Sequence, residues 1–366
     1  MFVFDFIQLF ADAGTVVNVS TGTVDAYTGN AHNSDALSPE LKTFYDTELL
    51  ENARVEMFYA QFAKKQPLPK GRGKNVEWRK WNTFAKAEQL QEGVIPTGQT
   101  FGMTYMTGAI NQYGTFASIS DQLELHAYDD IILGATEEMG ASAAETQETL
   151  IRDALLVNTN VMYCDTINLE TGENEGTPTM PSELVHGGGS MSALTPDMVA
   201  KAVTKLKKDR VPTINGKYYA VIHPSVAYDL RKSDAWIEAH KYASPEQIYN
   251  GEIGELHGCR FIENVFAPVL DGDYSPGAGG VSYATFFFGK EAFGIIDPEG
   301  GALEMIVHDK SEIGGPLNQF STVGYKFETN GATILYPERM LRVMSCSSFS
   351  DTDMANIEEY PVSGDA

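Results

Sequence analysis

Cysteine is scarce in this chain of 366 residues: it occurs only at Cys164, Cys259 and Cys346. No two of these form a C-x-x-C pair, whereas structural zinc sites are built from paired ligands. An isolated thiol without such a partner most often behaves as a small, buried apolar side chain in the reduced state. We therefore expect three free cysteines, and the sequence predicts neither a metal site nor a cofactor.

Long apolar runs are also lacking, since none approaches the roughly 20 residues that a membrane-spanning helix needs. The first ten residues are apolar, but they include Asp5 and have no basic flank, which is atypical of a secretory signal. We therefore expect no contact with a membrane, and a protein of the cytoplasm or of a particle that is assembled there.

The motifs of common catalytic and nucleotide-binding sites are incomplete. His186–Ser190 (HGGGS) resembles the glycine loop of esterases, but the G-x-S-x-G turn that presents a serine nucleophile is missing. Gly71–Lys74 (GRGK) resembles the end of a phosphate loop without its required spacing. The sequence predicts no catalytic residue and no enzyme. A hydrolase that uses His186 and a serine is kept only as a distant alternative.

Positive charge is in deficit, with 50 acidic against 26 basic side chains and a net charge of -24. Such a surface repels nucleic acid on average, which argues against a dedicated DNA-binding protein. The same acidic surface is compatible with a protein wall that encloses DNA without adhering to it. Residues 64–86 are the exception, because they carry eight basic side chains and a single acid, Glu77.

Within this basic segment, Asn75–Trp81 alternates apolar and charged residues, as a strand with one exposed face does. Glycines before the strand, at Gly71 and Gly73, and the turn residues Gly93 and Pro96 further on predict two strands joined by a long loop. This element is expected to project from the body of the protein.

Three interpretations of the basic segment are open. It can be a solvated hairpin that happens to be basic. It can contact nucleic acid, with Trp78 and Trp81 stacking on bases and Arg79 pairing with phosphate. It can also lie on the acidic body of an identical copy, which steers association and fixes register. We favour the third, because the rest of the chain supplies the opposite charge. The candidate inter-subunit contact residues are Lys70, Arg72, Lys74, Trp78, Arg79, Lys80 and Trp81.

A long helix and a mixed lobe are predicted after the basic segment. Ser120-Asp121 is a helix start, and the helical pattern continues to about Leu156, which corresponds to about 50 Å at 1.5 Å per residue. Residues 158–320 mix strands with helices that begin at Thr195, His223 and Ser244. A further helix is expected from Ser38, and an extended arm over residues 11–37.

Several segments together carry a resemblance, over roughly residues 37–157 and 283–346. They are Gln8–Asp12 (QLFAD), Leu37–Asp46 (LSPELKTFYD), Phe62–Pro69 (FAKKQPLP), Lys74–Arg79 (KNVEWR), Leu90–Pro96 (LQEGVIP), Gln112–Gly114 (QYG), Ser118–Asp121 (SISD), Pro316–Gln319 (PLNQ) and Ser321–Lys326 (STVGYK). In order and spacing they resemble the major capsid proteins of tailed bacteriophages of the phage N-four type. These segments are structural and identify no reactive site.

The resemblance implies the HK ninety-seven capsid fold, an α+β fold with an N-terminal arm, an extended two-stranded loop, a long spine helix, and peripheral and axial domains. The implied boundaries are 1–37 for the arm, 38–63 with 101–157 and 301–348 for the peripheral domain, about 121–156 for the spine helix, 64–100 for the extended loop, 158–300 for the axial domain and 349–366 for an acidic tail.

The resemblance also implies a structural role. Copies of such a protein form pentamers and hexamers that close into an icosahedral shell around double-stranded DNA, which is enclosed without sequence-specific binding. The expected location is the virion, after assembly in the cytoplasm of the bacterial host, with portal, scaffold and decoration proteins as further partners. An encapsulin-like compartment with protein cargo is the alternative role for the same fold.

Overall fold

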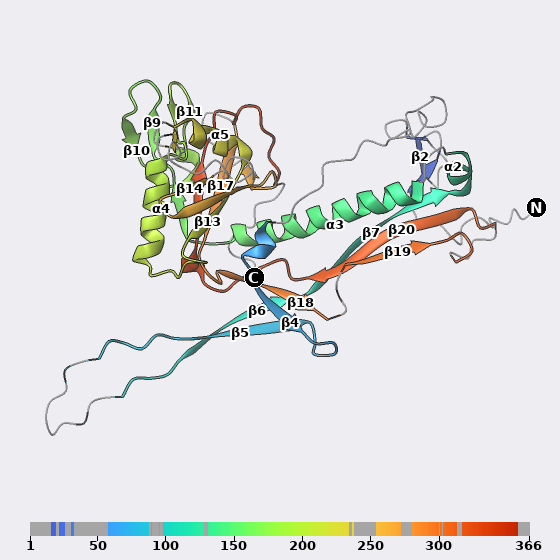
Figure 1. The fold of residues 1–366 in the computed structure, drawn as a ribbon, viewed down its shortest axis with the longest axis horizontal. Coiled ribbons are helices and arrows are strands. Elements are labelled where there is room, and N and C mark those ends of the chain that lie inside the picture. The colour runs from blue at the N-terminus through green and yellow to red at the C-terminus, as the bar shows by residue number, and fades with distance from the viewer. Residues whose placement is uncertain are drawn as a thin grey trace, which may run out of the picture. The chain divides into compact units, whose positions relative to one another are not determined.

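The structure is a computed structural model, and it describes residues 16–19, 22–25, 31–32, 58–87, 89, 95, 98–127, 131–233, 236–237, 254–271, 280–299, 301, 303–312 and 317–357. The chain divides into two compact units (Figure 1). Unit 1 contains Met1–Glu56, Asn111–Gln147 and Pro298–Thr329. Unit 2 contains Met57–Ile110, Glu148–Asp297 and Asn330–Ala366.

Unit 1 is built on a six-stranded sheet with the order β19-β20-β7-β1-β2-β3. The strands are β19 (Glu304–His308), β20 (Phe320–Thr329), β7 (Asn111–Ser120), β1 (Val16–Val19), β2 (Gly22–Asp25) and β3 (Ala31–His32). The two longest strands, β7 and β20, pair antiparallel along their whole length. The strands β1 to β3 lie in the region expected to be an extended arm, and β1 pairs with β7 of the same chain.

Helices cover one face of this sheet. Ser120 ends β7 and caps α2 (Asp121–His126), since its Oγ accepts the backbone N–H of Leu123 at 3.3 Å. The long helix α3 (Ile131–Leu156) follows, so the helix predicted at about 121–156 is present as two helices. On β20, the odd-numbered side chains from Ser321 to Phe327 are buried, and the Tyr325 hydroxyl lies 3.2 Å from Ser142 Oγ of α3. The even-numbered side chains therefore point to the other face.

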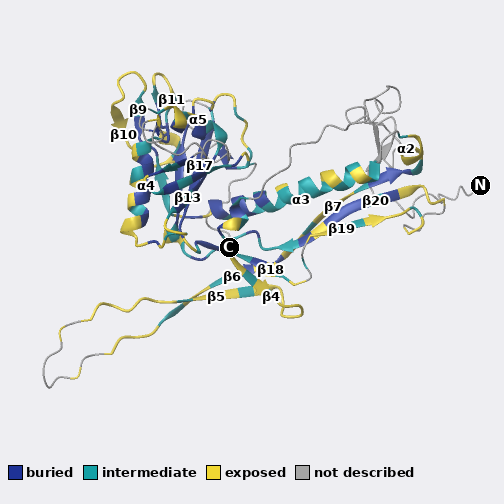
Figure 2. Ribbon diagram, viewed as in Figure 1, coloured by how far each residue is buried: buried dark blue, intermediate teal, exposed yellow. Residues whose placement is uncertain are grey.

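Unit 2 contains a seven-stranded sheet, ordered β14-β15-β13-β17-β22-β8 with β16 paired to β17. Its strands are β14 (Gly254–Leu256), β15 (Cys259–Glu263), β13 (Tyr218–Ile222), β17 (Ser282–Phe288), β22 (Met340–Ser345), β8 (Val161–Tyr163) and β16 (Val269–Leu270). Every residue of β17 is buried (Figure 2). Tyr283 and Phe287 belong to the core that includes helices α4 (Pro196–Lys208) and α5 (Pro224–Lys232). Phe286 and Phe288 belong to a second core, with Tyr59 and Leu155.

The helix starts predicted at Thr195 and His223 are confirmed. Thr195 Oγ1 accepts the backbone N–H of Met198 at 3.4 Å, and Pro196 occupies the first turn, where no N–H is required. His223 Nδ1 accepts the backbone N–H of Ser225 at 3.3 Å. The helix starts expected at Ser38 and Ser244 lie outside the described residues.

The described residues of unit 2 also form three smaller sheets, with the orders β10-β9-β12-β11, β21-β18-β4 and β5-β6. Their strands are β9 (Thr166–Asn168), β10 (Asn174–Gly176), β11 (His186–Gly187), β12 (Ser190–Met191), β21 (Thr333–Ile334), β18 (Phe293–Pro298), β4 (Lys64–Leu68), β5 (Asn75–Trp81) and β6 (Met103–Ala109). Short 3₁₀ helices are η2 (Tyr59–Gln61), η3 (Pro181–Glu183) and η6 (Pro337–Arg339).

The two compact units differ from the predicted domain boundaries. Within the predicted peripheral domain, residues 330–348 lie in unit 2, where β22 pairs with β17 in the seven-stranded sheet. Within the predicted extended loop, β4 belongs to another sheet than β5. The division into arm, loop, peripheral and axial domains therefore stays a prediction.

The three cysteines are free and buried, as expected. Burial raises the pKa of the Cys346 thiol to about 12, so this thiol stays protonated and unreactive at neutral pH. None of the helices in the described part of the chain is long and apolar enough to cross a membrane.

A buried carboxylate on α3 holds the segment that leads into the basic region. Glu148 is fully buried, and its Oε1 accepts the backbone N–H groups of Phe58 at 3.1 Å and Tyr59 at 3.3 Å, and the side-chain amide of Asn264 at 2.7 Å. One turn later, the buried Arg152 donates to the Phe266 and Asn356 carbonyls. Removal from water raises the pKa of Glu148, although these three donors and Arg152 oppose that shift.

We predict that Glu148→Ala lowers the free energy of unfolding by about 3 kcal/mol, because three buried donors lose their acceptor. Glu148→Gln keeps an acceptor oxygen and is expected to cost less than about 1 kcal/mol. Burial raises the native pKa of Glu148, so the contribution of this carboxyl to stability is fully present below its unfolded-state pKa and is lost as pH rises through the native pKa. Denaturant unfolding of dissociated subunits at pH 5 and pH 7.5 should therefore show a pH dependence that Glu148→Gln reduces.

Candidate inter-subunit interface

The basic segment predicted from sequence forms one strand of a hairpin. β5 and β6 pair antiparallel over seven residue pairs, from Asn75 opposite Ala109 to Trp81 opposite Met103. Because side chains alternate along a strand, Val76, Trp78 and Lys80 share one face of β5, and Asn75, Glu77, Arg79 and Trp81 share the other. The candidate contact residues on this strand are therefore divided between two faces.

Trp78 fixes the root of the hairpin. Its side chain is only 8% exposed and packs in a small core with Ile110, Ile296 and Leu335. A Cβ atom added at Gly108 would lie 2.8 Å from the indole ring, and one added at Gly294 would lie 3.0 Å from it. The indole therefore fills the space that these two glycines leave. It offers little surface to another molecule, and we omit it from the proposed contact residues.

Lys80 is engaged within unit 2. Its Nζ lies 2.8 Å from Glu338 Oε1 and 4.4 Å from the centre of the Tyr336 ring. Partial burial is the largest single effect and would raise the pKa of Glu338, but the hydrogen bond and charge of Lys80, a backbone N–H and the charge of Arg339 together lower that pKa. Lys80 therefore helps to hold the hairpin to η6, and we assign it no contact with a second molecule.

The other basic candidates are exposed. Lys70, Arg72 and Lys74 lie in the turn between β4 and β5, where Gly71 and Gly73 adopt φ values of +82° and +93° that favour glycine. On β5, Arg79 pairs with Glu77 at 3.0 Å, and both side chains are exposed. Exposed pairs contribute little to stability. These positive side chains remain accessible to a partner.

A stack of exposed aromatic rings lies at the outer ends of β5 and β6. It includes Trp81, the last residue of β5 and a predicted contact residue, together with Phe84 and Phe101, which the sequence did not indicate. The ring centroids of Trp81 and Phe101 are 4.1 Å apart, and those of Phe84 and Phe101 are 5.3 Å apart. The three residues, called here the aromatic stack, are 56%, 60% and 53% exposed in that order. Contiguous exposed aromatic side chains are typical of interaction surfaces.

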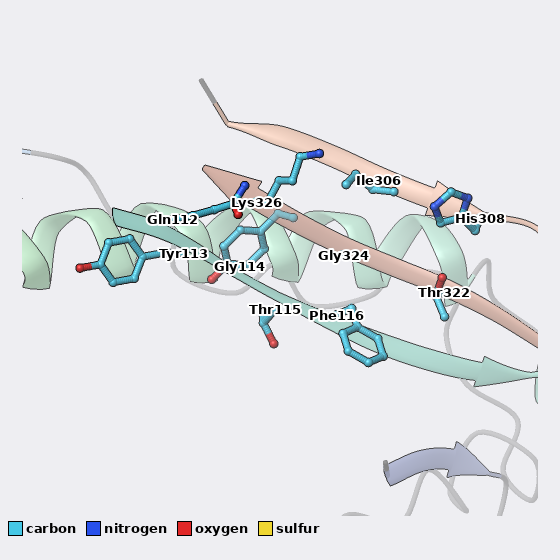
Figure 3. Close-up of a pocket in the computed structure, with 11 residues that line it drawn as sticks. Gln112, Tyr113, Gly114, Thr115, Phe116, Ile306, His308, Thr322, Gly324 and Lys326 are labelled. Carbon is cyan, nitrogen blue, oxygen red and sulfur yellow. The ribbon is translucent and has the colours of Figure 1, made fainter. Parts of the chain in front are cut away.

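Unit 1 carries a second feature that the sequence did not indicate. A pocket of about 450 Å³ lies over β7, β20 and β19, and Figure 3 shows the residues around it. Gly114 and Gly324 contribute no side chain, while Phe116 and Ile306 contribute apolar surface. His308, Thr322 and Lys326 lie around its edge. We call this pocket the glycine hollow.

One comparison with known proteins identifies the family of this chain. The profile of a family described as phage capsid protein matches residues 104–327, which is more than half of the chain. No curated protein gives a significant match.

Solved phage capsids are similar to the chain in structure. The capsid of cyanophage P-SCSP1u has a TM-score of 0.58 and 15% identity, and the match covers 87% of this chain and 98% of that one. The capsid of Ralstonia phage GP4 has a TM-score of 0.61 and 13% identity, with 86% and 97% covered. The capsid of cyanophage Pam1 has a TM-score of 0.61 and 13% identity, with 88% and 100% covered. These similarities confirm the predicted HK ninety-seven capsid fold.

The structure predicts that the two hairpin tryptophans differ sharply in their effect on stability. Trp78→Ala should lower the free energy of unfolding by about 3–5 kcal/mol, because it empties a packed site between two glycines. Trp81→Ala should change it by less than about 1 kcal/mol, because that ring is mostly exposed. Chemical denaturation of dissociated subunits measures both values. Equal losses would show that the assignment of the two rings is wrong.

Proposed function

This chain belongs to the phage capsid protein family, and we propose that its copies assemble as pentamers and hexamers into an icosahedral shell that encloses double-stranded DNA. It is a major capsid protein of a tailed phage, as the resemblance in the sequence predicted, and its copies associate with one another in the virion capsid. The proposal concerns how they do so. The observation that carries it is the exposed hairpin with its basic and aromatic side chains.

The hairpin suits contact between identical copies because of its charge. Residues 64–86 hold eight basic side chains and one acid, in a chain whose net charge is -24. A hairpin of one copy is therefore attracted to most of the surface of another copy. Each exposed ion pair contributes at most about 1 kcal/mol, so stability must come from many repeated contacts around a closed ring.

We propose no enzymatic activity. His186 Nε2 lies 3.2 Å from Asp351 Oδ1. Gly188 and Gly189 form the turn of the β11–β12 hairpin, and both have positive φ values, as does Gly187 at the end of β11. The glycine loop thus has a structural explanation, and no observation favours the hydrolase. The encapsulin-like alternative gains no support either, because the matched family is one of phage capsids.

The proposal includes the parts that the resemblance implies. Residues 64–100 serve as the extended loop, 1–37 as the arm, 158–300 as the axial domain and 349–366 as an acidic tail, and the remaining segments form the peripheral domain. DNA is enclosed without sequence-specific contact. Assembly takes place in the cytoplasm of the bacterial host, with portal, scaffold and decoration proteins as further partners.

We predict that the triple variant Arg72→Glu, Lys74→Glu and Arg79→Glu folds normally but forms no closed shells at physiological ionic strength. The three side chains are exposed, so their reversal should leave the free energy of unfolding within about 1 kcal/mol of the wild type. Negative-stain microscopy detects shells, and denaturation measures folding. Lys80 is left unchanged because it pairs with Glu338.

The matched control keeps the charges and changes the side chains: Arg72→Lys, Lys74→Arg and Arg79→Lys. This variant should assemble as the wild type does. Normal shells from the charge-reversed variant would contradict the electrostatic part of the proposal. Failure of both variants would show that the shape of these side chains matters and their charge does not, which would contradict it equally.

A further inference from the structure

We propose that a group of basic side chains at the carboxyl end of α4 binds the phosphate backbone of double-stranded DNA. This inference rests on the proposed function, because it names the surface through which the shell touches the DNA that it encloses. The group, called here the α4 basic patch, consists of Lys207, Lys208, Arg210, Lys290 and Arg339. The first four side chains are exposed and Arg339 is half-buried.

Backbone hydrogen bonds bring these residues together from three distant segments of unit 2. The backbone N–H of Lys290 donates to the Pro212 carbonyl at 2.9 Å, and that of Gly289 donates to the Arg339 carbonyl at 2.8 Å. Arg339 Nη1 donates in turn to the Lys290 carbonyl at 3.1 Å. A Cβ atom at Gly289 would overlap Val211 Cγ1, so glycine permits this close approach. The patch is therefore a product of the fold and not of one basic run in the sequence.

The positive charges of the patch are poorly balanced within the chain. Among the described residues, none of the four exposed side chains forms an ion pair. Two acids that adjoin the patch in sequence are already occupied. Glu291 pairs with Lys64 at 3.6 Å. Glu338 pairs with Lys80 at 2.8 Å. Asp209 is the only acid among residues 205–212, so a positive surface remains on a chain whose net charge is -24.

The backbone at Arg210 indicates that its side chain does more than end the helix. Arg210 follows the last turn of α4 with a φ value of +57°, and the Val211 N–H donates to the Leu206 carbonyl at 3.0 Å. Glycine is preferred at such a position, because a side chain is strained there. An arginine that is kept at a strained position points to a use for its charge.

The chemistry of the patch favours a polyanion over a protein surface. None of the large exposed apolar side chains lies within residues 205–212, 288–292 or 336–340, all of which the structure describes. The cores of protein interfaces are rich in apolar and aromatic side chains and poor in lysine. Lysine and arginine without such anchors are typical of contacts to phosphate, which carry no base sequence information.

The helix dipole does not account for the whole patch. Basic side chains in the last turn of α4 are stabilised by the negative end of that helix. Lys290 and Arg339 come from other elements, so this effect does not explain why they adjoin the end of α4. The acidic remainder of the surface repels DNA, which confines contact to places such as this patch.

The first test maps DNA contact in assembled, DNA-filled particles. Asp209→Cys places a thiol inside the patch and keeps its five cations, while the three native cysteines are buried and react poorly. Iron–EDTA attached to this thiol produces hydroxyl radicals with added peroxide and ascorbate, and these cut nearby DNA. We expect severalfold more cleavage from position 209 than from Thr171→Cys, an exposed control in the turn between β9 and β10.

Equal or weaker cleavage from position 209 in filled particles would overturn the inference while leaving the shell intact. Failure of the wild-type chain to form shells under any condition would instead overturn the proposed function. The two failures are therefore distinguishable.

A second test measures binding of a double-stranded DNA fragment to dissociated subunits at low ionic strength. One variant replaces Lys207, Lys208, Arg210 and Lys290 with Gln, and the matched control exchanges lysine and arginine at the same four positions. Each phosphate contact contributes about -0.9 to the slope of log K against log salt, so the glutamine variant should lose about 3–4 of that slope and bind at least about tenfold more weakly. The control should bind as the wild type does. Equal binding by the wild type and the glutamine variant would contradict the inference.

Arg210→Gly separates DNA binding from stability. Glycine relieves the strain at the positive φ value, so the denaturant midpoint should stay the same or rise. Binding of the DNA fragment should weaken severalfold, because one phosphate contact is lost. Unchanged DNA binding, or a fall in the midpoint, would count against the role assigned to Arg210.

Discussion

A two-stranded ribbon cannot bury both of its faces, and this constraint governs how the protein works. At the root of the hairpin, Trp78 and its neighbours pack against β18 and the segment around Leu335. Beyond the root, Trp81, Phe84 and Phe101 stack only on one another and stay more than half exposed. Isolated hairpins are marginally stable in water, so the outer part gains most when another surface covers it.

The rest of unit 2 gives that hairpin a firm root. Trp78 fills the space above two glycines, Lys80 binds Glu338, and Glu148 of α3 holds the backbone at Phe58 and Tyr59. These contacts hold the root of the hairpin against the rest of unit 2. This arrangement fits a capsid subunit, whose stability comes from contacts between copies.

Local signals predicted much of the fold. The helix starts at Ser120, Thr195 and His223 follow from capping side chains and prolines close by, and the family follows from motifs in order. Features that depend on pairing between distant strands could not be predicted. The approach of Trp81 to Phe101 follows from the β5–β6 register, which pairs Trp81 with Met103, and the glycine hollow follows from the β7–β20 register. Trp78 and Trp81 are an odd number of positions apart, which indicates that their side chains lie on opposite faces of the strand. Only the fold shows which of these two faces is covered.

The central claim is that a neighbouring copy covers the outer hairpin in the assembled shell. A cryo-electron microscopy reconstruction of shells formed by the purified chain, at a resolution that shows side chains, tests it most directly. We expect density for the rings of Trp81, Phe84 and Phe101 enclosed by a different copy. Closed shells in which these rings face solvent, or lie against their own chain, would contradict it.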